Sequence, residues 1–405
     1  MNPKIRLGEY TQDWLSCKAS DTFIQYTDKG HPELPVLSAS QEFGMIRRDC
    51  IGINMNYSTQ NINSYKHILP GQFVIHLRSF QGGFAHSAIE GISSPAYTIL
   101  RLKEEDRQDD YFWKYYFSSD SFIKRLESVT YGIRDGRSIS VNDFLNLPLF
   151  MPAIKNEQVK IGMFFSLVNE YIYATDKELT KLKNLKKACL EKMFPKDGEN
   201  VPEIRFGGFT GNWQKVKLNE YLQPSGEKNV NNTYDKFDIF SVSGDYGVVN
   251  QIEFQGKSFA GASLIGYKVT HQGQTIYTRS PLKAQPYGII KANKKCDGIV
   301  SALYAVYDAI KPINTDFIEV YFRLDKRLNE YLRPLVNKGA KNTLLVSDDD
   351  ALKGEILIPK DIEEQDAIVN YFANLDTQIS SREKKLSKLK NIKKSLLEKM
   401  YVSNE

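Results

Sequence analysis

Apolar side chains recur at alternating steps of three and four along two stretches of the chain. In the C-terminal stretch these positions are Phe372, Leu375, Ile379, Leu386, Leu389, Leu396 and Met400. In the earlier stretch they are Phe165, Val168, Ile172, Leu179, Leu182, Cys189 and Met193. Such spacing, held over nearly four heptads, is typical of a long helix with a coiled-coil seam. We therefore predict two helices of about 35 residues, each about 50 Å long, that begin just after Pro152 and Pro359.

Polar residues interrupt the two seams at matching places. Thr175 and Lys186 stand in the first seam, and Arg382 and Lys393 stand in the second. Polar residues in a seam lower stability but fix the register of the helices. Neither helix can bury its apolar stripe alone, so we expect the two helices to pack antiparallel against each other as a coiled coil.

The chain also repeats itself. At an offset of 207 residues, 179–194 align with 386–401, and eleven of the sixteen positions are identical. Fixed offsets of 207 and 199 residues further pair Glu157-Gln158 with Glu364-Gln365, and Pro3, Arg6 and Trp14 with Pro202, Arg205 and Trp213. We interpret the chain as a tandem duplication with approximate two-fold symmetry.

Each copy opens with a segment of mixed character. Short β-branched and aromatic runs, such as 73–77 and 97–100, alternate with Gly, Asn and Ser clusters, and the stretch 110–126 has a helical pattern. The predicted fold class is therefore α+β, with two globular domains separated by the two long helices. The predicted boundaries are 1–150 for the first globular domain, 151–196 for the first helix, 197–356 for the second globular domain and 357–405 for the second helix.

Composition is that of an ordinary globular protein. The 405 residues are 41% hydrophobic and 25% charged, enough for two or three domains. No apolar run approaches the roughly 18 residues of a membrane span, and the N-terminus has no apolar signal segment, so we expect a cytoplasmic protein. The four cysteines form no Cys-x-x-Cys pair, and we expect reduced, mostly buried thiols.

The net charge of +5 is unevenly distributed. Residues 177–193 carry +4 and residues 382–400 carry +6, so the rest of the chain carries −5. Clustered basic residues are the usual footprint of nucleic-acid binding, although a lysine-rich helix is more often a solvated face. If the chain binds DNA, a partner or local patches must neutralise much of the phosphate charge.

Motifs for catalysis are missing from the sequence. It contains no Walker loop, no dinucleotide-binding glycine fingerprint and no His-Glu-x-x-His. The five histidines have no metal-ligand spacing, so we assign no metal ligands and no catalytic residues. The run Asp348-Asp349-Asp350 is interpreted as a helix-start cap. We therefore predict that the chain is not an enzyme by itself.

Taken together, these patterns resemble the specificity subunit of type I restriction–modification systems. The resemblance rests on the helix starts 152–158 and 359–365, on the Leu-Glu-Lys-Met blocks at the two helix ends, and on the linker 202–213. It implies two target recognition domains, each reading one half of a split DNA target, with the helices setting the spacer. It also implies that two methyltransferase subunits and two motor–nuclease subunits are partners. S-adenosylmethionine, ATP and Mg²⁺ are then expected on those partners, and no cofactor on this chain.

Candidate DNA-reading residues follow from side-chain chemistry. Arg pairs with guanine, Gln pairs with adenine, and Ser and Lys reach phosphates or base edges. Two segments aligned at an offset of 201 follow predicted strands and differ in content, as two different half-sites require. Their candidates are Arg78, Ser79, Gln81, Arg279, Ser280, Lys283 and Gln285. Arg78 and Arg279 are explained equally well as a shared structural arginine, and the polar stretches 41–61 and 243–257 are equally good candidates for DNA contact.

Two other functions stay open from the sequence. A non-catalytic coiled-coil interaction scaffold would bind protein partners without DNA and would show no salt-sensitive DNA affinity. An enzyme with an unrecognised active site in a globular domain would turn over substrate without partners. The duplicated recognition architecture favours the specificity subunit over both.

Overall fold

The structure, a computed structural model, describes residues 2–40, 43–51, 59–76, 83–126, 130–131, 138–261, 263–278, 284–338 and 344–402. Two compact units make up the chain. Unit 1 comprises Met1–Lys177 and Glu383–Glu405, and unit 2 comprises Glu178–Arg382. Each unit therefore combines a globular part with one half of each long helix.

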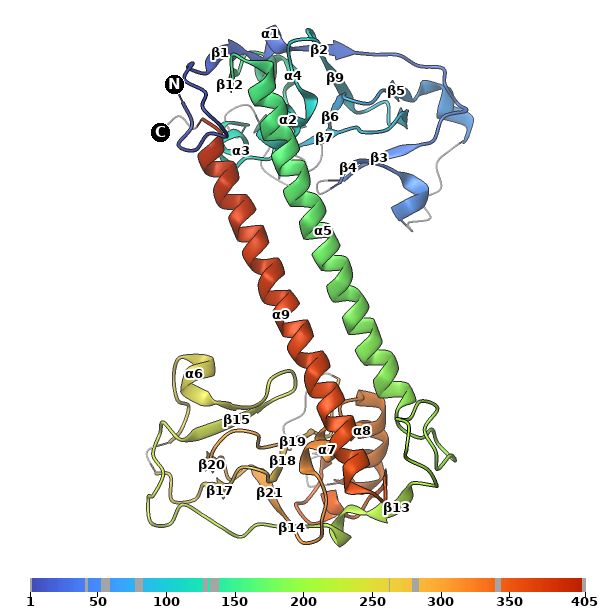
Figure 1. The fold of residues 1–405 in the computed structure, drawn as a ribbon, viewed down its shortest axis with the longest axis vertical. Helices are drawn as coiled ribbons and strands as arrows, with labels where there is room; N and C mark the ends of the chain where they lie inside the picture. Colours follow the sequence, from blue (N-terminus) through green and yellow to red (C-terminus); the bar gives the residue numbers. More distant parts are fainter. Residues whose placement is uncertain are drawn as a thin grey trace. The chain divides into compact units, whose positions relative to one another are not determined.

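Both long helices predicted from the apolar ladder are present, as α5 (Lys155–Lys192) and α9 (Ile362–Met400) (Figure 1). They contain 38 and 39 residues. α5 begins three residues after Pro152, and α9 begins three residues after Pro359. The side chains at the apolar ladder positions of α5 and α9 are shielded from solvent. Phe165, Leu179, Phe372 and Leu386 are buried, and Ile172, Leu182, Ile379 and Leu389 are half-buried.

Within each unit the two helix halves lie side by side and run in opposite directions. In unit 1 the Phe165 ring stacks on Tyr401 with centroids 6.0 Å apart, and the Lys385 ammonium lies 4.6 Å from the centroid of the Tyr171 ring. In unit 2, Lys186 Nζ lies 2.6 Å from Asp376 Oδ1. The Lys186 that interrupts the first seam is thus neutralised by a carboxylate of the other helix.

Unit 1 is built around a four-stranded sheet of order β2-β9-β6-β7. Its strands are β2 (Phe23–Tyr26), β9 (Thr98–Leu102), β6 (Phe73–Ile75) and β7 (Phe84–His86). Antiparallel pairs surround it: β1 (Leu15–Lys18) with β12 (Pro148–Met151), β3 (Leu37–Ser40) with β4 (Gly44–Arg47), β5 (Lys66–Ile68) with β8 (Gly91–Ser93), and β10 (Thr130–Tyr131) with β11 (Ser138–Ile139). The short helices are α1 (Ala19–Thr22), α2 (Asp110–Tyr116), α3 (Asp120–Leu126) and α4 (Val141–Leu145), with 3-10 turns η1 (Arg48–Ile51) and η2 (Thr59–Ser64).

Unit 2 has elements that correspond to those of unit 1. One sheet has the order β14 (Leu222–Pro224), β21 (Tyr304–Ala309), β18 (Thr275–Thr278), β19 (Ile289–Ala292). The other has the order β16 (Gly247–Asn250), β15 (Ile239–Ser243), β20 (Gly298–Val300), β17 (Lys268–Thr270). Two strand pairs accompany them, β13 (Gln214–Lys217) with β24 (Glu355–Ile358) and β22 (Asn337–Lys338) with β23 (Leu344–Leu345). The helices are α6 (Gln251–Gln255), α7 (Thr315–Tyr321) and α8 (Asp325–Leu332), with 3-10 turns η4 (Leu218–Glu220), η5 (Arg333–Leu335) and η7 (Asp350–Leu352).

The repeated helix ends are core residues. Met193 and Phe194, at the end of α5, are buried in the core of unit 2 with Trp213 and Phe317. At the end of α9, Tyr401 is buried in the aromatic core of unit 1 and donates from its hydroxyl to the carbonyl of Phe112 over 3.2 Å. Two similar environments thus explain why the Leu-Glu-Lys-Met blocks are alike.

The single helix predicted for 110–126 is wrong, because the chain forms α2 and α3 instead. The hydroxyls of Ser118 and Ser119 donate to the carbonyls of Tyr115 and Tyr116 over 2.8 and 2.7 Å. Serine side chains that bond the nearby backbone compete with helix continuation. Ser119 then caps α3, because its hydroxyl accepts the N–H of Phe122 over 3.3 Å.

The capping role assigned to the Asp348–Asp350 run is also wrong. Asp349 stands at the N-cap of the 3-10 turn η7, but its side chain makes no capping hydrogen bond. The N–H of Asp350 donates to the Ser347 hydroxyl over 3.0 Å. Asp348 instead pairs with Lys268 over 2.7 Å. Among the cysteines whose side chains the structure describes, Cys189 is buried, Cys17 half-buried and Cys296 exposed, and all three are free thiols. No helix in the described part of the chain is long and apolar enough to cross a membrane.

Candidate nucleic-acid interface

A buried carboxylate joins the N-terminal segment of unit 1 to the start of α5. Arg6 donates from Nε and Nη2 to the two oxygens of Glu157 over 2.9 and 2.7 Å. The indole N–H of Trp14 donates to the same carboxylate over 3.2 Å. The Glu157 side chain is only 1% exposed. A two-point Arg–carboxylate pair fixes orientation as well as distance, so it sets how the globular part meets the helix.

Unit 2 repeats this junction at the start of α9. Arg205 donates to Glu364 over 2.7 and 2.8 Å, and the Trp213 indole donates over 3.3 Å. The neighbouring glutamines match as well: the amide nitrogens of Gln158 and Gln365 donate to the carbonyls of the two helix-start prolines over 3.1 and 3.3 Å. These contacts give the repeated Glu-Gln pair a structural role.

Most of the predicted DNA-reading residues lie outside the described residues. These are Arg78, Ser79 and Gln81, between β6 and β7 in the sequence, and Arg279, Ser280 and Lys283, between β18 and β19. Gln285 is described and half-buried, and its amide nitrogen donates to Asp325 at the start of α8. While that bond persists, the Gln285 amide offers a base its oxygen and its second N–H, but not both N–H donors.

An exposed aromatic ring stands at the tip of the β3–β4 hairpin of unit 1. The Phe43 side chain is 53% exposed, and its N–H donates to the Ser40 hydroxyl over 3.3 Å. Gly44 follows with φ +77°, and a Cβ there would lie 2.3 Å from the carbonyl oxygen of His86. Only glycine fits this position, so the backbone turn that presents Phe43 is fixed by sequence.

The β15–β16 hairpin of unit 2 has the same tip. The Tyr246 side chain is 69% exposed, and its N–H donates to the Ser243 hydroxyl over 3.3 Å. Gly247 follows with φ +70°. The exposed ring of Phe254, on α6, lies 5.2 Å from the Tyr246 ring.

The two tips share the pattern Ser-x-x-aromatic-Gly at an offset of 203 residues. Exposed rings of this kind can stack on bases or wedge between base steps. The rings of both tips lie within the stretches 41–61 and 243–257, but side-chain chemistry predicts base reading for polar residues and not for aromatic ones. The repeated pattern is the signal that would have found them.

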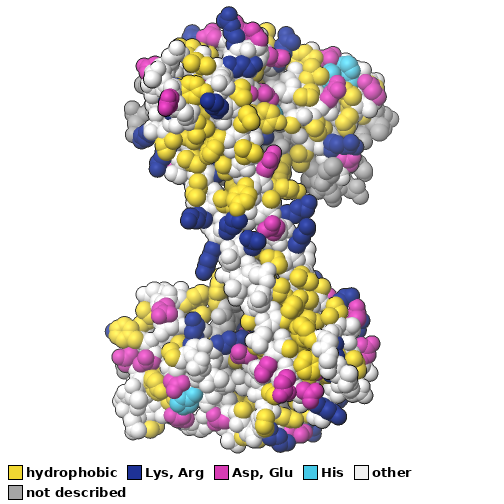
Figure 2. Space-filling model, viewed as in Figure 1, with side chains coloured by type: hydrophobic (Ala, Val, Ile, Leu, Met, Phe, Trp, Pro, Cys, Tyr) yellow, Lys and Arg dark blue, Asp and Glu magenta, His cyan; other side chains and the backbone are white. Residues whose placement is uncertain are grey.

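Lys and Arg side chains gather over the exposed surface of the long helices (Figure 2). In unit 1, Lys384, Lys388 and Lys390 of α9 are exposed, and none has a carboxylate partner among the described residues. The exposed face of α5 carries an apolar strip, in which Met163, Leu167 and Tyr171 follow one another at steps of four residues. Both surfaces are available to a ligand or a partner.

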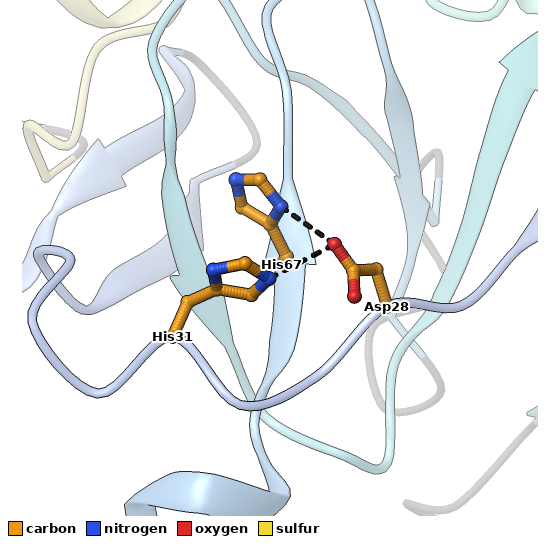
Figure 3. Close-up of side chains that lie close together, drawn as sticks. All are labelled: Asp28, His31 and His67. Atoms are coloured by element: carbon orange, nitrogen blue, oxygen red, sulfur yellow. Dashed lines mark hydrogen bonds and ion pairs between the residues drawn. The ribbon is translucent and has the colours of Figure 1, made fainter.

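Three side chains of unit 1 with metal-ligand chemistry lie close together, although the spacing of the histidines in the sequence predicts no metal site (Figure 3). Asp28 Oδ2 lies 3.0 Å from His31 Nε2 and 3.0 Å from His67 Nδ1. Asp28 and His31 follow β2, whereas His67 lies on β5. In the sequence, only the spacing Asp28-x-x-His31 indicates this cluster, because His67 is brought close to Asp28 and His31 by strand pairing.

Two solved structures resemble the chain over nearly its whole length. One is the crystal structure of the S subunit of a type I restriction–modification system from M. genitalium, with a TM-score of 0.61, 13% identity and 100% of both chains covered. The other is a structure reported for complex assembly and conformational transition of the type I R–M system, with a TM-score of 0.51, 16% identity, and 97% of this chain and 99% of that chain covered.

The likeness to a type I restriction–modification S subunit expected from the sequence is thus confirmed at the level of the fold. No protein-family model matches the sequence, and no curated protein matches it.

Proposed function

We propose that this chain is the DNA-binding specificity subunit of a type I restriction–modification complex. It reads a bipartite target in double-stranded DNA, one half-site per globular domain. It has no catalytic site of its own and directs adenine methylation and restriction by partner subunits. The observation that carries this proposal is the full-length likeness in fold to solved S subunits.

A tandem duplication supplies the two readers. The matched Arg6–Glu157 and Arg205–Glu364 junctions and the matched hairpin tips support a duplicated unit with approximate two-fold symmetry. The inward ladder of α5 and α9 supports an antiparallel coiled coil between the domains. On this account the target recognition domains are 1–150 and 197–356, and the helical regions are 151–196 and 357–405.

The helices set the distance between half-sites. B-DNA presents the same face every ~34–36 Å, so two readers on one side of the duplex need that separation. Helices of 38 and 39 residues are about 57 Å long, which is sufficient for the purpose.

DNA contact is assigned to two parts of each domain. The first part is the set of predicted reading residues: Arg78, Ser79, Gln81, Arg279, Ser280, Lys283 and Gln285. The second is the exposed ring at each hairpin tip, Phe43 and Tyr246. Polar side chains discriminate base edges, whereas a ring adds stacking that tolerates sequence.

The partners are two methyltransferase subunits and two motor–nuclease subunits. S-adenosylmethionine, ATP and Mg²⁺ belong to those subunits, and this chain supplies binding and orientation only. The apolar strip of Met163, Leu167 and Tyr171 on α5 is a surface on which a partner helix can dock. The place of action is the cytoplasm, where the DNA is.

Salt dependence of DNA binding separates this function from the protein-scaffold alternative. The chain, purified with its methyltransferase partner, is titrated with a DNA library at several salt concentrations. Binding that weakens steeply with salt, and a minority of sequences that stay bound, are expected for a specificity subunit. No DNA affinity in an assembled complex would favour the scaffold.

A further inference from the structure

The cluster of Asp28, His31 and His67 has the geometry of a metal site. Its three candidate ligand atoms, one from each side chain, all lie within 4.8 Å of one another. Asp28 Oδ2 stands 3.0 Å from each ring nitrogen that faces it. Ligands about 2.0–2.1 Å from a tetrahedral Zn²⁺ stand about 3.3 Å apart, so each of the two distances from Asp28 Oδ2 has to widen by only a few tenths of an ångström to admit the ion.

A second carboxylate orients His67 for this role. His67 Nε2 lies 2.8 Å from Glu90 Oε1, on the side of the ring away from Asp28. When Nε2 carries the proton and donates to Glu90, Nδ1 presents a lone pair toward Asp28. A carboxylate on the far nitrogen is the usual outer partner of a histidine that binds a metal.

The centre of the cluster calls for a positive charge. Both rings direct a nitrogen at the same carboxylate oxygen, and the ring centroids are 4.3 Å apart. Two ring nitrogens and one carboxylate oxygen therefore converge on the same point, and one divalent cation would satisfy all three atoms at once.

Unit 2 provides a natural comparison because it lacks both histidines. The bridges Lys29–Lys66 and Lys228–Lys268 place the two units in register, so Asp28 corresponds to Glu227. By the same register, valine stands in place of each histidine: Val230 for His31 and Val269 for His67. The histidine pair is therefore not required by the fold that the two units share.

We propose that Asp28, His31 and His67 bind a divalent transition-metal ion of the zinc class in unit 1. Imidazole and carboxylate ligands suit Zn²⁺, and water fills the side of the site that faces solvent. Asp28 and His31 lie in the segment between β2 and β3, and His67 lies on β5. The ion therefore fastens the segment that leads into the β3–β4 hairpin to a neighbouring sheet. This inference does not depend on the proposed DNA-binding function.

Zinc titration of the full chain tests the site. The protein is stripped with a chelator and titrated with Zn²⁺ by calorimetry, and Co²⁺ is added in parallel to record its visible spectrum. We compare His31→Val and His67→Val, which introduce the residues of unit 2, with Glu90→Gln. The matched control is His271→Ala, which removes a histidine held by Asp297 and Glu227 over 2.8 and 2.9 Å but without a second histidine.

We expect one tightly bound Zn²⁺ per wild-type chain and a Co²⁺ spectrum of imidazole ligation. Glu90→Gln should weaken binding about 10- to 100-fold. Each valine variant should weaken binding more than that, and His271→Ala should not change it. The Co²⁺ spectrum of the wild-type chain tests the site even if a variant fails to fold. Absence of stoichiometric Zn²⁺ binding, or full binding by His67→Val, would overturn the proposal.

Discussion

Arg205 and Glu364 are 159 residues apart in the sequence and form a two-point ion pair, with N–O distances of 2.7 and 2.8 Å. The Glu364 side chain is 1% exposed and also accepts the Trp213 indole N–H. Glu364 belongs to the first turn of α9, whereas Arg205 lies in the segment before β13. The pair therefore fixes the start of a long helix against the globular part of unit 2.

Removal of this carboxylate should destabilise unit 2. Glu364→Ala leaves the largely buried Arg205 without its counter-ion, and breaking such a pair costs about 3 kcal/mol. Hydrogen–deuterium exchange on the full chain should show faster exchange throughout unit 2. Lys215→Ala is the control, because it breaks only the exposed pair with Glu355. Equal exchange in the two variants would mean that the buried pair adds nothing to stability.

The hairpin-tip rings should contribute to DNA affinity. Tyr246→Ala removes a side chain that is 69% exposed, so the fold should tolerate it. Stacking on a base is worth about 1–3 kcal/mol, so we expect roughly a tenfold loss of affinity in the assembled complex. Tyr246→Phe keeps the ring and, as Phe43 occupies the matching place in unit 1, should bind as the wild type does. If Tyr246→Ala left the DNA affinity unchanged, the Tyr246 ring would not be part of the DNA interface.

Stability of the metal-free protein should depend on pH through His67. Burial disfavours the charged ring, but hydrogen bonds with Asp28 and Glu90 outweigh this and raise the pKa of His67 above 6.5. A histidine whose pKa is raised by folding stabilises the folded state. This stabilisation is complete below the unfolded pKa of about 6.5, and it is lost as the pH rises through the pKa of the folded state.

The free energy of unfolding of wild type and His67→Val, measured by urea denaturation in chelator, should therefore differ most near pH 5.5. The difference should shrink toward pH 8.5, and Zn²⁺ should restore it there. A difference that grows with pH in chelator would contradict this assignment of charge.

Helix length should control the spacer of the DNA target. A seven-residue insertion in both α5 and α9 preserves the seam, because the heptad repeats every seven residues. It lengthens each helix by about 10 Å. Methylation mapping should then report a different spacer between unchanged half-sites. An unchanged spacer would mean that the helices do not set it.

The long helices could be predicted because their information is local. The three-four ladder and the prolines before each helix place α5 and α9 within a few residues of the observed bounds. The break between α2 and α3 was missed because Ser118 and Ser119 bond the backbone, which apolar periodicity does not report.

The contacts at the candidate sites were harder to predict, because they join distant segments. Asp28 and His67 are 39 residues apart and meet only because the Asp28 carbonyl accepts the His67 N–H over 2.9 Å. The repeated Glu157-Gln158 string is visible in the sequence, but the bonds of Glu157 to Arg6 and Trp14 depend on tertiary structure. The exposed rings were overlooked because aromatic residues are normally assigned to a core.

Methylation mapping of the assembled complex tests whether the chain specifies a bipartite DNA target. The chain is co-expressed with its proposed methyltransferase partner in a host free of DNA methylation, and modified adenines are mapped by single-molecule sequencing. We predict methylation at one bipartite motif with a fixed spacer, and loss of one half-site preference when one globular domain is exchanged. An assembled complex that leaves the genome unmodified, or modifies a single continuous motif, would contradict this prediction.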